Sequence, residues 1–230
     1  MLKVINGIEY TSFDIGGKPV QFVVSKNMHN DSEVVHIVGN IDGVPVVRIA
    51  SGAFKQSGDL EEIELPDSIY AIDTEAFWGC DKLRTIRFYK TSVAHSNNAV
   101  SIGAEAFYQC IALSNIETVK PLHLNGKNIF TNCHSLEKLN EGNLVLGVIW
   151  ACDFLNCDKL KTIHITGKSC KLWTDCFKGL KNLESVTFDC NTVRMPESVR
   201  RILLKLKIYC SANSSIADLV YFGADVEIIN

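Results

Sequence analysis

The sequence lacks the features by which several classes of protein are recognised. Its net charge is only −3, so no strong field recruits nucleic acid or an anionic membrane. No apolar run reaches the roughly 18 residues needed to cross a bilayer. The first ten residues lack the apolar stretch and small-residue cleavage site of a signal peptide. If the chain is complete, these absences favour a cytoplasmic protein that inserts into no membrane and binds no nucleic acid.

Motifs of enzymes and metal proteins are also missing. The chain contains no Cys-x-x-Cys and no His-x-x-x-His, and Cys152 and Cys157 are too loosely spaced for a zinc knuckle. It contains no Gly-rich phosphate loop. We therefore expect no catalytic residues, no metal and no cofactor. A cysteine-based enzyme or metal protein is the least favoured alternative.

What the chain does contain is one short pattern repeated six times. Each copy begins with a phenylalanine, and positions occupied mostly by Cys, Leu and Ile follow at intervals of three residues. The phenylalanines are Phe54, Phe77, Phe107, Phe130, Phe154 and Phe177. Successive copies are 23, 30, 23, 24 and 23 residues apart. A fixed period of 20–29 residues is the signature of a leucine-rich-repeat solenoid, whose stacked coils form one continuous core.

Each copy divides into two pieces. In the piece 60–65, Ile63 and Leu65 point to one face of a strand while Glu62 and Glu64 point to the other. In the piece 72–80, apolar residues spaced by four fit a single helical or 3₁₀ turn. The predicted fold is an α/β solenoid, a right-handed leucine-rich-repeat superhelix. A parallel β-sheet forms one face of it, and short helical or 3₁₀ turns form the other.

We expect a single domain over residues 1–230, with a cap at each end. Residues 1–48 form a β cap, in which 4–10 and 20–24 pair as a hairpin around Gly16 and Gly17. Six repeats occupy 49–190. Residues 191–230 form an αβ cap with a helix over 200–206, a strand over 207–210, a helix begun by Ser214 or Ser215 and ended by Gly223, and a strand over 226–229.

An insertion near residues 90–98 lengthens the interval between the second and third copies. Such insertions map to loops on one face of a solenoid, sometimes the binding face. The plainer interpretation, a tolerated surface bulge, is favoured because longer loops add little closure entropy.

The nine cysteines are an odd number, which argues against a framework of paired disulfides. Four of them, Cys80, Cys110, Cys133 and Cys157, share one repeat position. Side chains at one position of stacked coils point the same way, so buried thiols are favoured over disulfides for these four. The redox state of the others is left open; they are Cys152, Cys170, Cys176, Cys190 and Cys210.

Aromatic residues outside the core pattern are the best candidates for protein binding. Trp150 and Trp173 both lie four residues before the phenylalanine of their copy, so they should be neighbours in stacked coils. Trp78 and Tyr108 follow their phenylalanines directly and should also be neighbours. Exposed aromatic pairs make a protein-binding patch. The alternative is that these rings shield the edges of the core.

Strand positions that face away from the core offer a second candidate surface. Arg87, Glu117 and His164 lie in one predicted column and Lys138 in the other. These columns mix acidic, basic and neutral polar residues and contain no aromatic anchor, although binding sites favour Tyr, Trp and Arg. A solvated sheet face is at least as good an interpretation as a binding face.

The repeat also resembles a known family. The pattern Ile-x-x-x-Ala-Phe-x-x-Cys-x-x-Leu-x-x-Ile-x-Leu-Pro-x-Ser-Ile is similar to that of the BspA-like leucine-rich repeats, also called the Treponema pallidum type. Departures occur at Ile129, Asp153 and Leu180, and we interpret them as drift. The resemblance implies no enzyme. It implies a cell-surface or secreted protein of a host-associated microbe, because several members are regarded as adhesins that bind host proteins.

The function expected is therefore a non-catalytic protein-protein interaction module, with an adhesin or host-interaction protein as its more specific form. The partner is a protein of unspecified identity, and the chain itself is expected to be a monomer. The alternative is a structural spacer domain without a specific ligand.

Overall fold

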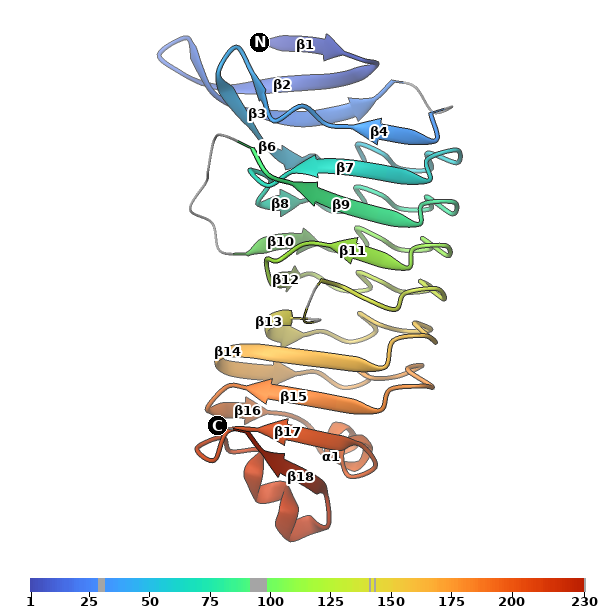
Figure 1. Ribbon diagram of the computed structural model, residues 1–230, viewed down its shortest axis with the longest axis vertical. Helices are drawn as coiled ribbons and strands as arrows, with labels where there is room; N and C mark the ends of the chain where they lie inside the picture. Colours follow the sequence, from blue (N-terminus) through green and yellow to red (C-terminus); the bar gives the residue numbers. More distant parts are fainter. Residues whose placement is uncertain (29–31, 92–98, 141, 143, 230) are drawn as a thin grey trace.

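The computed structural model describes residues 1–28, 32–91, 99–140, 142 and 144–229. Coils stack along the long axis of the molecule, with the two chain ends at opposite ends of the stack (Figure 1). We number the coils by their phenylalanines, the coil of Phe54 being the first. Most of the predicted insertion near 90–98 lies outside the described residues; only Lys90 and Thr91 fall within them.

Each coil runs through a back row and a front row of strands, which form two layers (Figure 1). The front row begins with β4 (Val34–His36), β7 (Glu62–Pro66), β9 (Thr85–Tyr89) and β11 (Asn115–Glu117), a parallel sheet of four strands. The back row contains β6 (Val44–Ile49), β8 (Ala71–Ile72), β10 (Val100–Gly103), β12 (Leu122–Asn125), β13 (Leu144–Ile149) and β16 (Thr192–Arg194). A two-residue strand, β5 (Asn40–Ile41), pairs with β6 in antiparallel fashion. Inward-facing side chains from both rows form the core.

One long strand, β14 (Thr162–Leu172), belongs to both rows. Its first half pairs with β15 (Ser185–Asp189) in front, its second half pairs with β16 behind, and β13 pairs with both halves. The front row then ends with β17 (Lys207–Cys210) and β18 (Asp225–Ile228). Among the described residues, the fourth coil adds no front strand to β11, only an isolated bridge between Asn115 and Lys138. The front ladder is therefore interrupted at this coil.

The segment around each phenylalanine is a run of tight turns. In the second coil, bonds of the 3₁₀ type join Ala76 N to Asp73 O, Trp78 N to Glu75 O, and Cys80 N to Phe77 O. Between them, Glu75 and Gly79 have positive φ angles of 56° and 69°. Phe77 N donates across to Ala106 O of the next coil at 2.8 Å. The segment is a series of β-turns where the spacing predicted a single helical or 3₁₀ turn, and bonds between coils satisfy the turn backbone.

A column of stacked phenylalanines fills the core beneath these turns. The rings of the first five coils lie nearly parallel, with centroid separations of 5.1, 5.4, 5.3 and 5.6 Å. All five side chains are fully buried. Each ring in the middle of the column thus contacts one ring above and one below, whereas Phe54 at the end contacts one.

The N-terminal cap is a three-stranded meander, in which the second and third strands form the predicted hairpin and an additional strand precedes them. Its strands are β1 (Leu2–Ile5), β2 (Ile8–Ile15) and β3 (Lys18–Asn27). Asn6 and Gly7 have φ angles of 49° and 73° and form a turn that divides the segment 4–10. An Asn-Gly pair is the strongest short signal for a two-residue hairpin turn. The predicted turn at Gly16 and Gly17 is present, and β3 pairs with β6 to cover the first coil.

The C-terminal cap follows the predicted order of elements. It contains α1 (Glu197–Leu203), β17, the 3₁₀ helix η1 (Ala217–Phe222) and β18. Gly223, with φ of 86°, ends η1 as predicted. The helix begins at Ile216 without a side-chain cap across its first turn, and Ser214 Oγ instead donates to Cys190 O at 2.7 Å. No helix among the described residues has the length and apolar character to cross a membrane.

The phenylalanine column predicts a graded loss of stability. Replacing Phe107, which stacks on both sides, by alanine should lower the free energy of unfolding by about 3–5 kcal/mol, since a buried ring is lost and a cavity remains. Replacing Phe54, which stacks on one side, should lower it by less. Urea titrations of the two variants measure the difference. Equal and small effects at both positions would contradict the importance of the stack.

Candidate interaction surfaces

The two tryptophans predicted to be neighbours do stack on each other. The Trp150 and Trp173 rings lie 5.2 Å apart at 15°, and they follow the ends of β13 and β14 in the fifth and sixth coils. Trp150 Nε1 donates to Leu124 O at 3.2 Å, which anchors that indole to the fourth coil. Trp173 is 38 % exposed, and Lys171 Nζ lies 4.1 Å from its ring centroid. The Trp150 indole is therefore held in place by a hydrogen bond, and the Trp173 ring stacked on it remains partly exposed to solvent.

A second aromatic pair lies beside the phenylalanine column. Trp78 and Tyr108 stack with centroids 5.9 Å apart at 8°, and Lys55 Nζ lies 4.7 Å from the Trp78 ring centroid. Both rings are half-buried. Because these rings are partly buried and partly exposed, they fit both interpretations given above: a protein-binding patch, or a cover for the edge of the core.

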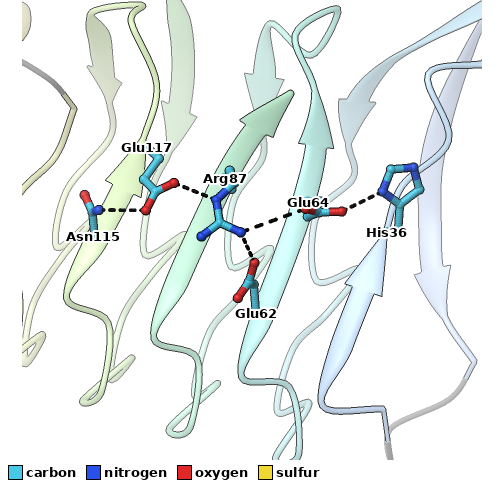
Figure 2. Close-up of polar contacts among 6 residues, drawn as sticks. All are labelled: His36, Glu62, Glu64, Arg87, Asn115 and Glu117. Atoms are coloured by element: carbon cyan, nitrogen blue, oxygen red, sulfur yellow. Dashed lines mark hydrogen bonds and ion pairs between the residues drawn. The ribbon is translucent and has the colours of Figure 1, made fainter. Parts of the chain in front are cut away.

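The front sheet carries a polar network that joins four strands (Figure 2). Arg87 is its centre: it donates to Glu62 and, at 2.6 Å, to Glu117, and it lies 3.9 Å from Glu64. These carboxylates raise the pKa of Arg87, with the Glu117 hydrogen bond as the largest cause. Because three carboxylates surround one guanidinium, the network holds Arg87 in place and keeps it from other partners.

Two further residues extend this network at its edges. His36 Nδ1 lies 2.9 Å from Glu64 Oε2, and its ring stacks on Tyr89 at 4.7 Å. Asn115 Nδ2 donates to Glu117 at 3.2 Å (Figure 2). His36 was absent from the predicted site because β4 precedes the first full repeat. The similarity of Val34-Val35-His36 to Glu62-Ile63-Glu64 could have indicated that His36 occupies the strand position of Glu64. The two segments do pair in this register.

The predicted site residues fall on separate surfaces. Arg87 and Glu117 belong to the front network, and Lys138 lies exposed beside Asn115. His164 lies farther along the front row on β14, half-buried, and burial lowers its pKa. Its Nε2 has no hydrogen-bond partner in the described part of the chain. The aromatic pairs follow the back strands and the turns, so they form no common surface with the front network.

The four column cysteines are buried free thiols, as predicted. Each Sγ donates to the carbonyl of the phenylalanine one coil earlier, at 3.0 Å from Cys80 and Cys110 and 3.1 Å from Cys133 and Cys157. Burial raises the pKa of Cys80 to about 12 and raises the pKa of the other three as well. Such thiols carry little of the thiolate that nucleophilic chemistry requires.

The remaining cysteines differ from this column. Cys170 in the second half of β14 and Cys190, directly after β15, form a disulfide with Cα atoms 6.4 Å apart. Cys152 is a half-buried free thiol, and Cys176 and Cys210 are buried ones. In the described ranges, no three His, Cys, Asp or Glu side chains lie close enough together to hold a metal ion.

Asp153, which appeared to be drift in the repeat, is a fully buried acid. It stands where the second and third coils have alanine. Its carboxylate accepts hydrogen bonds from Trp150 N at 2.7 Å and Ile129 N at 3.5 Å. Burial raises the pKa of Asp153 to about 7, although both bonds oppose that rise. The sequence gives an acid at an alanine position, which is a signal that a buried titrating group is present.

Comparison with known families confirms the resemblance carried by the repeats. A model described as the BspA type leucine-rich repeat region matches six copies over residues 47–99 and 90–201. This chain belongs to the BspA-type leucine-rich-repeat family. Leucine-rich-repeat proteins of this kind are generally non-catalytic repeat proteins that take part in protein interactions. No curated protein matches the chain.

One solved structure supports the same fold for this BspA-type chain, and two others align less well. The T. pallidum leucine-rich-repeat protein aligns with a TM-score of 0.66 and 20% identity, over 93% of this chain and 99% of that one. A leucine-rich cell surface protein from Faecalibacterium prausnitzii aligns with a TM-score of 0.45 and 14% identity, over 95% and 86%. A leucine-rich-repeat protein from Bacteroides ovatus aligns at 0.39 and 16%, over 97% and 81%. At these identities the likeness concerns the fold alone.

The column thiols of this BspA-type protein should react with alkylating reagents only when it unfolds. In the native protein, Cys152 should be labelled first because it is the only half-buried free thiol among the described residues. Iodoacetamide labelling followed by peptide mass spectrometry, with and without urea, measures each site. Rapid native labelling of Cys110 or Cys133, or a disulfide between column residues, would overturn the buried-column interpretation.

Asp153 should make stability depend on pH. The folded protein holds the Asp153 proton more tightly than the unfolded chain does. The stability contributed by the neutral acid is therefore complete below about pH 4 and is lost as pH rises through about 7. Asp153→Asn keeps an acceptor oxygen and cannot ionise, so at pH 8 it should be more stable than the wild type by on the order of 2–4 kcal/mol.

The same comparison at pH 5 should show a much smaller difference. Asp175→Asn is a matched control, since Asp175 is exposed and has a positive φ that asparagine also tolerates. Denaturant titrations at both pH values give the free energies of unfolding. If Asp153→Asn and the wild type share one pH profile, Asp153 does not titrate as described.

Proposed function

We propose that this BspA-type chain is a non-catalytic protein-interaction module whose partner contacts the Trp150–Trp173 pair. The observation that carries the proposal is the geometry of that pair. One indole is anchored by its N–H group to the preceding coil, and the stacked outer indole is 38 % exposed. Tryptophan is among the residues that contribute most to binding at protein interfaces.

The rigidity of the pair supports this role. Stacking at 5.2 Å and the bond to Leu124 O hold both rings in one orientation before any partner arrives. Lys171 above the outer ring adds a cation at the edge of the patch. Little conformational entropy is then lost when the rings are covered, and pre-organised side chains bind more tightly for that reason.

The more specific form of the proposal is an adhesin that binds host proteins at a cell surface. The family resemblance supports it, and so does the Cys170–Cys190 disulfide. Disulfides persist in oxidising environments, which include the extracellular space and exclude most cytosolic compartments. Surface plasmon resonance against host extracellular proteins tests this form directly.

A structural spacer is the second candidate, and the charged edge of the solenoid favours it. Exposed acids and bases on that edge pair with each other between coils. The pairs are Asp59–Lys82, Glu61–Arg84, Glu137–Lys159 and Lys161–Glu184. A surface whose charges are satisfied internally offers few groups to a partner.

A double substitution separates the two candidates. Trp150→Ala/Trp173→Ala should retain the fold and lose at least about tenfold in affinity for proteins captured by the wild type, because hot-spot residues contribute upwards of 2 kcal/mol each. Pull-downs from host and bacterial extracts identify the partners, and affinities are then measured on purified protein.

The matched control is Trp78→Ala/Tyr108→Ala, which removes a similar stacked pair from another part of the surface. It should keep the affinity of the wild type. Equal losses in both variants would indicate a general structural effect, and unchanged binding by Trp150→Ala/Trp173→Ala would refute the proposed contact.

A further inference from the structure

A groove of about 620 Å³ crosses the front face where β9, β11 and the fourth coil meet. It lies on the front row, whereas the ends of β13 and β14 that lead into the tryptophan pair lie in the back row (Figure 1). We propose that this groove is a second binding site, which takes an extended acidic peptide segment with an apolar side chain between its carboxylates.

The groove exists because the third coil leaves the sheet early. β7 and β9 each have five residues, whereas β11 has three. After β11 the chain turns, with Lys120 N donating to Thr118 Oγ1 at 3.1 Å. Lys120 Nζ then reaches Asp67 O at 2.6 Å, which ties this turn to the first coil. The turn therefore projects from the sheet and forms one side of the groove, which lies over the adjoining strands.

Part of the groove is apolar. Phe88 lines it and is only partly buried, although the residues at the same strand position in other coils are covered. Those residues, Leu65, Ile165, Phe188 and Cys210, are fully buried. On the projecting turn, Val119 is 70 % exposed. Phe88 thus presents apolar surface that a five-residue β11 would have covered, and Val119 adds apolar surface from the turn. An apolar side chain can occupy the space between them.

The unpaired charge around this apolar surface is positive. Lys90 and Lys138 line the groove, are exposed, and form no ion pair within the residues that the structure describes. Lys120 is partly buried, and this burial lowers its pKa even though Asp67 opposes the change. A carboxylate placed near Lys90 and Lys138 gains Coulomb energy from two ammonium groups that form no ion pair with a described residue.

The acidic side chains of the groove already have partners. Glu117 accepts hydrogen bonds from Arg87 and Asn115 (Figure 2). Asp67 Oδ1 accepts two from Thr91, through its N–H at 2.9 Å and its hydroxyl at 2.6 Å. Arg87 is likewise held by its carboxylates. The lysines are therefore the charged groups that remain for a ligand.

The surroundings favour a short acidic segment over a nucleic acid. Glu62 and Glu64 lie on the same face beside the groove, as part of the network of Figure 2. A long polyanion laid across this face would meet them and be repelled. A peptide with two or three carboxylates around an apolar residue can place its charges at the lysines and avoid those acids.

Fluorescence anisotropy with a fluorescein-labelled Glu-Leu-Glu-Leu-Glu peptide tests the site. The wild type should bind it saturably, and Lys90→Gln/Lys138→Gln should weaken binding by about tenfold, since two unpaired charges are removed. Val119→Ser should weaken it by about threefold, through loss of apolar contact. All three side chains are exposed, so these variants should fold like the wild type.

The matched control is Lys168→Gln/Lys178→Gln, which removes the same charge from exposed lysines outside the groove. It should bind like the wild type, as should Trp150→Ala/Trp173→Ala, because the tryptophan site is separate. A Gln-Leu-Gln-Leu-Gln peptide should bind about tenfold more weakly. The proposal is overturned by absent saturation at millimolar peptide, by equal losses in the control, by equal binding of the glutamine peptide, or by tighter binding of single-stranded DNA.

Discussion

The same backbone hydrogen bond, in the same place, connects each of the first four coils of this protein to the coil that follows it. The backbone N–H beneath each of their core rings donates to the carbonyl one coil further on, from Phe54 to Ala76 and from Phe77 to Ala106, both at 2.8 Å. This bond sets the spacing at which the aromatic rings stack and the thiols meet carbonyls. Residues with positive φ on either side of it let the chain keep this alignment. The stacked core, the aromatic pairs and the outer columns all depend on that one registration.

Much of the fold could be predicted because the registration repeats. A position that recurs at a fixed period must point the same way in every coil, so the phenylalanine column, the thiol column and the pairing of Trp150 with Trp173 follow from spacing. The first strand of the N-terminal meander was missed for the opposite reason. It precedes the repeats, so their period gives no information about it. The turn that follows it can be predicted only from the Asn6-Gly7 pair, which favours a two-residue hairpin turn.

The candidate surfaces were predictable only in part. Arg87, Glu117 and Lys138 were expected on an outer face, and they lie there. Their roles depend on contacts that cannot be read from spacing. Arg87 contacts three carboxylates, and Lys138 lies beside the groove and forms no ion pair with a residue that the structure describes. Asp153 shows the same limit, since one substitution in an otherwise regular column places an acid in the core. The Cys170–Cys190 disulfide joins positions that are not equivalent in their coils, so no period could have indicated it.

The interruption of the front ladder at the fourth coil has a consequence for how the molecule holds together. In a solenoid, stability is close to a sum of terms for each coil and terms for each pair of neighbours. Where β11 meets the fourth coil, the front row is reduced to a single bridge, so fewer strand pairs couple these two neighbours than elsewhere in that row. Under tension or partial unfolding, the front row is therefore expected to open first at this junction.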